Sequence, residues 1–266
     1  MQYGFCTNIA FLDGDETSRV VFEGLVETGY DYVELPLSIL SARGDIGELK
    51  KRLADANLPC RACNLFFPPA LTLVGENQDK AGIEAYLQKV LPFAAEMGVE
   101  TLVFGNGGAR KIPPGATREA TFVNLRTLVE TMEKYASQTP VKICVELLNT
   151  TETDMINSYA QAVELTNGLK HVAAMIDSYH FLVEKHDYAA VLAHPHRMWH
   201  VHTAYSAQRL IPGPNDNKAE YAELQSTLKK LNYDGKISVE GGFRTTAPAE
   251  IKKEIKDALS MMKALF

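Results

Sequence analysis

The amino-acid sequence predicts an α/β protein with a single (β/α)8 TIM barrel spanning residues 1–266. Short β-branched or aromatic runs alternate with longer segments of helical period, and eight such pairs can be counted. No Pro- or Ser-rich linker divides the chain into two domains. A doubly wound sheet is the structural alternative. The Gly-x-Gly-x-x-Gly motif of dinucleotide-binding sheets, however, does not follow the first run.

Eight strands are expected in the order of the repeats. They are Tyr3–Thr7, Tyr32–Leu35, Cys60–Leu65, Thr101–Phe104, Val141–Leu147, Val172–Ile176, Met198–Thr203 and Lys236–Val239. The segments between them carry apolar residues at helical intervals, as in Glu84–Glu96, where Pro92 is expected to bend the helix. This order is typical of strands that each lead into an outer helix.

Composition and charge limit the classes of partner. Hydrophobic residues make up 46% and charged residues 23%, which excludes disordered and fibrous proteins. A net charge of −6 gives no general attraction to nucleic acid or to anionic lipid, so neither partner is expected. No apolar run reaches the ~20 residues of a membrane span, and no signal peptide is recognised. We therefore expect a cytoplasmic protein, for which a homo-oligomer is compatible with the sequence.

The cysteines are expected to be mostly buried and reduced, because they lie in apolar, strand-like contexts. They are Cys6, Cys60, Cys63 and Cys144. The lone C-x-x-C has no second pair with zinc-site spacing.

A glycine cluster, Gly105–Gly108, follows the fourth expected strand and lacks the Gly-Lys-Ser/Thr ending of a P-loop. With Arg110 and Lys111 nearby, it either binds an anionic group or forms a tight turn at the barrel rim. Both interpretations stay open.

Polar residues close six of the eight expected strands. They are Glu34, Asn64, Glu146, Asp177, His202 and Glu240. The catalytic face of a (β/α)8 barrel lies where its strands end. Burying several carboxylates together is costly unless a cation or protons lie between them. Three carboxylates with one imidazole form an oxygen-rich set that suits Mn²⁺, Mg²⁺ or Co²⁺.

Four motifs carry a family resemblance. They are Glu146-Leu-Leu-Asn149-Thr-Thr-Glu152, Asp177-Ser-Tyr-His180, His200-Val-His202-Thr and Val239-Glu240-Gly-Gly-Phe243. In order and approximate spacing they resemble E-P-L-N-x-x-E, D-x-x-H, H-x-H-x-G-E and V-x-E. These motifs belong to the sugar isomerase/epimerase superfamily with xylose-isomerase-like barrels, and the likeness is closest to ketose 3-epimerases of the tagatose/psicose type. The resemblance covers about residues 141–243. Within it, Leu147 replaces the family's proline, and Tyr205 stands where the family usually has an acid.

The resemblance implies a ligand set and several substrate contacts. One divalent ion, Mn²⁺ in first place with Mg²⁺ or Co²⁺ as alternatives, is expected on Glu146, Asp177, His202 and Glu240. His202 is preferred to His200 because the second histidine of the motif is the family's ligand. Glu152 and His180 match positions that hold substrate hydroxyls, and Arg209 resembles the substrate-contacting arginine. In the loop after the third strand, Phe66 either walls the sugar pocket or packs at the barrel rim.

The function implied is a divalent-metal-dependent ketose epimerase or aldose–ketose isomerase acting on a sugar or sugar derivative. Glu146 and Glu240, on non-adjacent strands, would flank the sugar plane; one removes a carbon-bound proton and the other returns it, through an enediolate. A lyase or dehydratase with the same metal and base, or a non-catalytic sugar-binding relative, stays open. An apurinic endonuclease is disfavoured because Asn64 and Asn106 follow the third and fourth strands and the charge is acidic.

Overall fold

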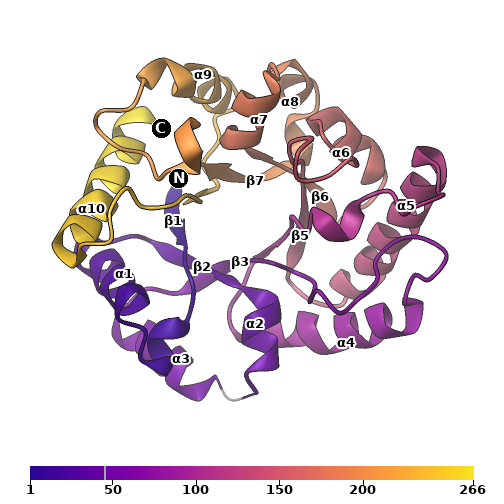
Figure 1. Ribbon diagram of the computed structural model, residues 1–266, viewed down its shortest axis with the longest axis horizontal. Helices are drawn as coiled ribbons and strands as arrows, with labels where there is room; N and C mark the ends of the chain where they lie inside the picture. The colour runs from indigo at the N-terminus through magenta and orange to yellow at the C-terminus, as the bar shows by residue number, and fades with distance from the viewer. Residues whose placement is uncertain (45) are drawn as a thin grey trace.

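The computed structural model, which describes residues 1–44 and 46–266, contains eight parallel strands closed into a barrel and surrounded by helices (Figure 1). The strands are β1 (Gln2–Cys6), β2 (Tyr32–Pro36), β3 (Cys60–Asn64), β4 (Thr101–Phe104), β5 (Lys142–Glu146), β6 (Val172–Asp177), β7 (Met198–Thr203) and β8 (Lys236–Val239). Each strand pairs with the next, and β8 pairs with β1. The predicted (β/α)8 barrel is confirmed, and every strand end lies within one residue of its predicted position.

The outer layer consists of helices that return the chain from one strand to the next. They are α1 (Glu16–Thr28), α2 (Leu37–Ala42), α3 (Gly47–Asp55), α4 (Lys80–Glu96), α5 (Arg118–Ala136), α6 (Tyr159–Leu165), α7 (Ser178–Glu184), α8 (Ala189–Ala193), α9 (Ala222–Lys230) and α10 (Pro248–Leu265). Short 3₁₀ segments are η1 (Ala10–Asp13), η2 (Gly108–Arg110), η3 (Pro195–Arg197), η4 (Ala207–Arg209) and η5 (Lys218–Tyr221). Helix α4 continues through Pro92. The last helix, α10, packs against α1 and closes the ring (Figure 1).

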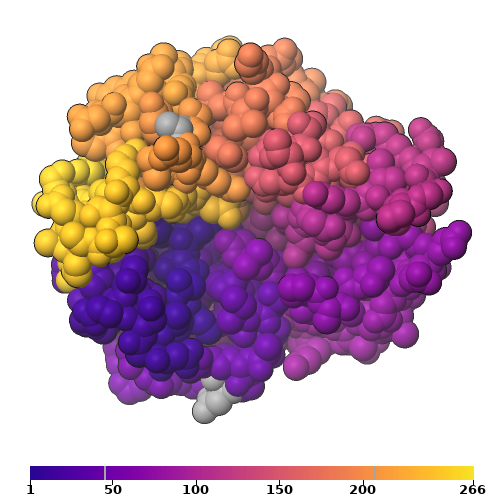
Figure 2. Space-filling view, viewed as in Figure 1, coloured from indigo at the N-terminus to yellow at the C-terminus, as the bar shows by residue number. Residues whose placement is uncertain are grey.

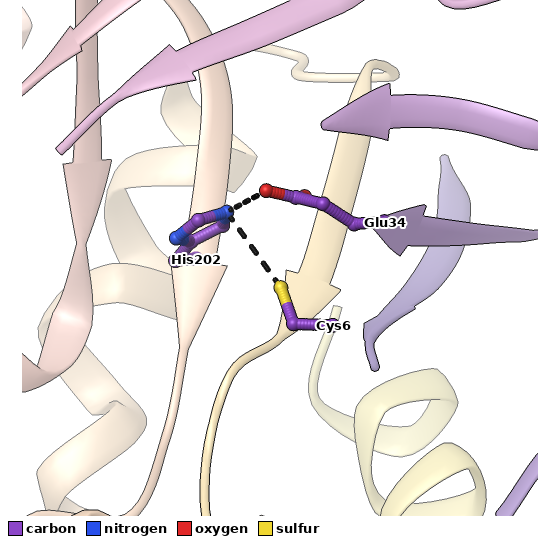
Figure 3. Close-up of side chains that lie close together, drawn as sticks. All are labelled: Cys6, Glu34 and His202. Carbon is purple, nitrogen blue, oxygen red and sulfur yellow. Dashed lines mark hydrogen bonds and ion pairs between the residues drawn. The ribbon is translucent and has the colours of Figure 1, made fainter. Parts of the chain in front are cut away.

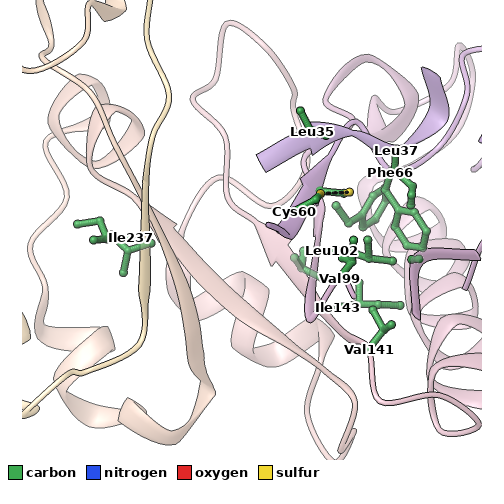
Figure 4. Packing of buried hydrophobic residues seen from close by; sticks show 14 of the residues in the cluster. Leu35, Leu37, Cys60, Phe66, Val99, Leu102, Val141, Ile143 and Ile237 are labelled. Carbon is green, nitrogen blue, oxygen red and sulfur yellow. Dashed lines mark hydrogen bonds between the residues drawn. The ribbon is translucent and has the colours of Figure 1, made fainter. Parts of the chain in front are cut away.

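The hydrophobic core lies between the strands and the helices. Strands of a parallel barrel are covered on both faces, so they form nearly continuous apolar runs. Every residue of β6 is buried, for example. Leu102 of β4 and Ile143 of β5 pack in the layer shown in Figure 4, near Cys60 and Phe66. In such a scaffold a charged residue inside a strand stands out, because its surroundings are apolar.

The four cysteines are free thiols, and three of them are buried as expected. Cys6 is the exception, because it ends β1 at the barrel mouth and is only half-buried. Among the described residues, no helix combines the length and the apolar character needed to cross a bilayer.

Candidate active site

Four predicted residues converge at the barrel mouth. One ligand atom from each of Glu146, Asp177, His202 and Glu240 lies within 4.8 Å of the other three. Glu146 and Asp177 end β5 and β6, His202 lies in β7 beside Asp177, and Glu240 directly follows β8. Because these strands are parallel, their carboxyl ends meet at one face of the barrel. Glu240 is the half-buried member, which leaves the cluster open on one side.

The imidazole of His202 has a different neighbour at each nitrogen. Its Nδ1 lies 3.2 Å from Glu146 Oε1 and 3.0 Å from Glu240 Oε2. Its Nε2 lies 2.9 Å from Oε1 of Glu34, which comes from β2 across the barrel (Figure 3). Burial opposes ionisation of Glu34, but His202 and His200 outweigh it and lower the pKa of that carboxyl below its usual range. An ionised carboxylate only accepts, so His202 Nε2 carries a proton and Nδ1 faces the cluster.

Glu34 itself is held by two further hydrogen bonds. The Oγ of Ser238 donates to Glu34 Oε2 over 2.7 Å, and His200 Nε2 lies 3.0 Å from the same oxygen. His200 therefore points into the barrel as the i, i+2 spacing allows, but it lies against Glu34 and outside the four-residue cluster. A carboxylate that orients a ligand histidine through its second nitrogen is a recurrent feature of metal sites. The only sequence signal for this role is the carboxylate within an apolar strand.

Charge in the cluster is balanced by cationic side chains. Burial raises the pKa of Glu146. The hydrogen bond with His202 lowers this pKa in part, and the charge of Glu240 raises it further. Burial also opposes ionisation of Glu240, yet His202 and Arg209 lower its pKa to about 2. Burial lowers the pKa of His202, but Glu34 and Glu240 outweigh it, so the pKa lies well above the usual value. The cluster therefore carries concentrated negative charge that demands positive charge close by.

Arg209 lies over the cluster. Its Nη2 lies 2.9 Å from Asp177 Oδ2 and 2.6 Å from Glu240 Oε2, and its guanidinium stacks 4.8 Å from the ring centre of Tyr179. Burial lowers its pKa, but these carboxylates raise it above the usual range. Gln208 and Arg209 have left-handed backbone φ values of 59° and 51°. Strained backbone of this kind is concentrated at functional sites.

The donor set fits a divalent metal. Three carboxylates and one imidazole nitrogen supply hard oxygen ligands and a borderline nitrogen, the combination that Mn²⁺, Mg²⁺ and Co²⁺ accept. A second group, Cys6, Glu34 and His202, also brings its atoms within 4.8 Å of one another. This group is a weaker candidate for a metal site, because Cys6 Sγ lies 4.0 Å from His202 Nε2 and Glu34 already accepts three hydrogen bonds. The cluster of Glu146, Asp177, His202 and Glu240 is consistent with a divalent metal site.

The predicted substrate residues Glu152 and His180 also lie beside the cluster. The backbone N–H of Asn149 donates to His180 Nδ1 over 3.1 Å, so the proton of this ring sits on Nε2. That buried nitrogen lies 3.5 Å from Asp177 Oδ2 and has no hydrogen-bond partner in the described structure. The Nδ2 of Asn149 also donates to Glu152 Oε1 over 2.8 Å, and Arg209 Nη1 lies 3.6 Å from that oxygen. Buried donors without a partner are rare and call for an explanation such as a ligand.

Phe66 takes the packing alternative that the sequence left open. Its side chain is fully buried, its ring stacks on Phe67 with centroids 4.5 Å apart, and its carbonyl accepts from Tyr86 of α4. The preceding residue, Leu65, lines the mouth instead, with half of its surface exposed. Leu65 is exposed and Phe66 is buried because the backbone turns at Leu65, which has a positive φ of 44°. No local sequence pattern signals this turn.

The glycine segment after β4 is a support for Glu146. Strands β4 and β5 pair Phe104 with Val145, so Gly105 lies beside Glu146. A Cβ at Gly105 would stand 2.0 Å from Glu146 Oε2. Arg110 is fully buried and donates from Nη1 to the Glu146 carbonyl over 2.8 Å. Burial lowers its pKa to about 10, so it remains charged at neutral pH. A buried Arg110 is not available to a dissolved anion, which favours the tight turn.

Comparisons with known proteins show the family to which the chain belongs. The family model described as "Xylose isomerase-like TIM barrel" matches residues 22–265. The 3-dehydro-D-guloside 4-epimerase of Escherichia coli (strain K12) is 26% identical over 88% of this chain and 90% of its own. The L-ribulose 3-epimerase of Methylomonas sp. (strain DH-1) is 24% identical over 84% of this chain and 78% of its own.

A solved structure shares the fold along the whole chain. It is the apo form of 3-keto-D-glucoside 4-epimerase from E. coli, with a TM-score of 0.80 and 24% identity over 99% of both chains. The family match extends from α1 to the end of α10. It includes all four residues of the cluster, Glu146, Asp177, His202 and Glu240, which we call the metal-type residues. This chain belongs to the xylose isomerase-like TIM barrel family, and it is similar to the two sugar epimerases named above.

Proposed function

We propose that the protein is a divalent-metal-dependent sugar isomerase that epimerises a keto sugar or interconverts an aldose and a ketose by proton transfer beside a carbonyl. One observation carries the proposal: Glu146 and Glu240 approach the same nitrogen of His202 from non-adjacent strands, at 3.2 Å and 3.0 Å. Two carboxylates placed on either side of one centre can serve opposite faces of a sugar. The similarity to two sugar epimerases supports the same reaction class.

We propose that Glu146, Asp177, His202 and Glu240 hold one divalent ion, Mn²⁺ in first place and Mg²⁺ or Co²⁺ as alternatives. When bound there, such an ion supplies Lewis-acid polarisation of a carbonyl oxygen and so eases loss of the proton on the neighbouring carbon. Glu34 keeps His202 Nδ1 turned towards this position through its hydrogen bond to Nε2.

The side chains around the cluster then have distinct tasks. One of Glu146 and Glu240 takes the carbon-bound proton, and the other returns it to the opposite face, which gives epimerisation. Return to the neighbouring carbon gives aldose–ketose isomerisation instead. His180 Nε2–H and the Arg209 guanidinium are donors for substrate oxygens, and Glu152 is an acceptor for a substrate hydroxyl.

The test is proton exchange in D₂O. Metal-loaded protein is incubated with a panel of free ketohexoses, ketopentoses and 3-keto-glycosides, and NMR identifies the carbon that gains deuterium. We expect deuterium at the carbon next to the carbonyl, together with a new epimer or the isomeric aldose. Thorough chelation should abolish the exchange, and added Mn²⁺ or Co²⁺ should restore it. Exchange that survives chelation would contradict the metal role.

The same experiment separates the lyase alternative. A dehydratase would use the same base but expel a hydroxyl, so the product would have lost water and would appear as a new unsaturated or deoxy species in the spectrum. Binding of the sugar without any exchange would instead indicate a sugar-binding protein.

A further inference from the structure

A cleft of about 480 Å³ opens beside the cluster and lies on one side of it. Of the four metal-type residues only Glu240 lines this cleft. The remaining walls come from the start of α1 and from the ends of β1, β2, β3 and β8, and they include Asn8, Ser18, Asn64 and Leu65. Figure 2 shows the surface hollowed where the indigo N-terminal segments meet the yellow C-terminal ones. A molecule held at the cluster has room to extend towards the first half of the barrel.

Two exposed aliphatic side chains stand in the wall of this cleft. Ile39, in α2, is 51% exposed, and Leu65, after β3, is 50% exposed. Leu65 also adopts a positive φ of 44°, which a bulky non-glycine residue rarely does. Exposed apolar surface beside backbone strain is expected where a ligand covers it. The neighbouring amides of Asn8 and Asn64 can hydrogen-bond to sugar hydroxyls.

A second cavity, of about 580 Å³, adjoins the cleft, because the two share Asn8 and Ile39. Pro68 and Pro69 also line this second cavity. A free ketose carries hydroxyls on nearly every carbon, so it gains little from Ile39, Leu65 and these prolines. An apolar or aromatic group attached to the sugar would bind more tightly, because it buries apolar surface against these side chains.

We propose that this groove, formed by the two cavities, binds the aglycone of a glycoside, so that the substrate is a keto sugar carrying an apolar or aromatic aglycone. The inference rests on the proposed function, because it is the cluster that fixes the sugar ring at the inner end of the groove. Glu240 lies at the junction of the cluster and the groove, which places the reacting carbons and the aglycone on opposite sides of that carboxylate.

The test compares the phenyl and methyl glycosides of one 3-keto-glucose with free D-fructose. Binding to the Mn²⁺-loaded protein is measured by calorimetry, and exchange is measured in D₂O. The variants are Ile39→Ser and Leu65→Ser, and the matched control is Val123→Ser, an aliphatic residue of α5 that is 62% exposed and lies outside both cavities. We expect the phenyl glycoside to bind at least about tenfold more tightly than the methyl glycoside, the size of effect that a buried aliphatic contact supplies.

Both serine variants should remove most of this preference, whereas Val123→Ser should keep it. Equal binding of the two glycosides, or an equal preference in all four proteins, would overturn the groove assignment. Exchange of any keto sugar in that case would leave the proposed function standing. A phenyl preference that is lost in Ile39→Ser supports the groove even where no exchange occurs. The absence of exchange would then refute the proposed function but not the groove.

Discussion

The two halves of the strand ring contribute differently to the barrel mouth. Strands β5 to β8 bring the four metal-type residues, each at or beside the end of its strand. Strands β1 to β4 end in Cys6, Pro36, Asn64 and Phe104 and bring none of them. The first half nevertheless reaches into the cluster, because Glu34 holds His202 and Gly105 leaves room for Glu146. The second half therefore brings the four clustered side chains together, and the first half contacts two of them and lines most of the cleft beside them.

The largest expected effect lies in the second half. Glu146→Gln and Glu240→Gln should each lower turnover by at least ~10²–10⁴-fold, because each variant keeps the shape and one oxygen but loses the base. If each glutamate serves one face, each variant should fail to start deuterium wash-in from a different epimer. The assay follows wash-in separately from each epimer, with the metal content confirmed.

Glu133→Gln is the control for that experiment. Glu133 is a partly buried carboxylate that accepts the backbone N–H groups of residues 170–172, far from the cluster. Its variant should retain normal exchange. Near-normal turnover of metal-loaded Glu146→Gln or Glu240→Gln protein would refute the role of the glutamate that was replaced.

A smaller but more selective effect is expected from the first half. In Gly105→Ala, the new Cβ takes the space of Glu146 Oε2, so the carboxylate must move. A displacement of about 1 Å of a catalytic group can cost about 10²-fold, and we expect a loss of this order in kcat. Gly108→Ala is the matched control, because a Cβ there meets nothing within 4 Å. Neither glycine has a positive φ, so backbone strain does not distinguish the two variants. Equal activities of the two variants would show that Gly105 does not position Glu146.

Glu34→Gln should weaken metal binding by ~10–100-fold, the range found when the carboxylate behind a ligand histidine is lost. The amide can no longer accept from both imidazoles, so the orientation of His202 is less fixed. Cys6→Ala is the control, because Cys6 Sγ also faces His202 Nε2, at 4.0 Å. Its metal affinity should stay normal. Loss of metal in Cys6→Ala would place the ion in the group of Cys6, Glu34 and His202. Titration of both variants with Mn²⁺ decides between the two groups.

The smallest effect concerns stability and not catalysis. Burial opposes ionisation of Glu133, but hydrogen bonds from His171 and the backbone lower its pKa. A carboxylate whose folded pKa is lowered stabilises the fold above its unfolded pKa, and this contribution is lost as the pH falls through the folded pKa. We expect Glu133→Gln to lower the free energy of unfolding by about 1 kcal/mol at pH 7. Urea unfolding should show this difference shrinking below about pH 4. A difference independent of pH would show that the charge of Glu133 does not matter.

The same division between the halves explains what the sequence could predict. The strands were predictable because apolar runs between polar loops are local features, and the cluster was predictable because Glu146, Asp177, His202 and Glu240 lie in local motifs. Glu34 was visible as a buried carboxylate, but its bond to His202 joins residues 168 positions apart. The role of Gly105 depends on the pairing of β4 with β5, and the exposure of Leu65 depends on its φ angle. These are distances and angles that no local pattern carries.

The central claim is that the second half holds one ion while Glu34 turns His202 towards it. Anomalous X-ray diffraction from Mn²⁺-soaked crystals tests this most directly, with elemental analysis of the same protein. We predict one manganese per chain, about 2.0–2.4 Å from carboxylate oxygens of Glu146, Asp177 and Glu240 and from Nδ1 of His202. Manganese bound at Nε2 of His202 beside Cys6, or no anomalous peak at saturating Mn²⁺, would contradict the claim.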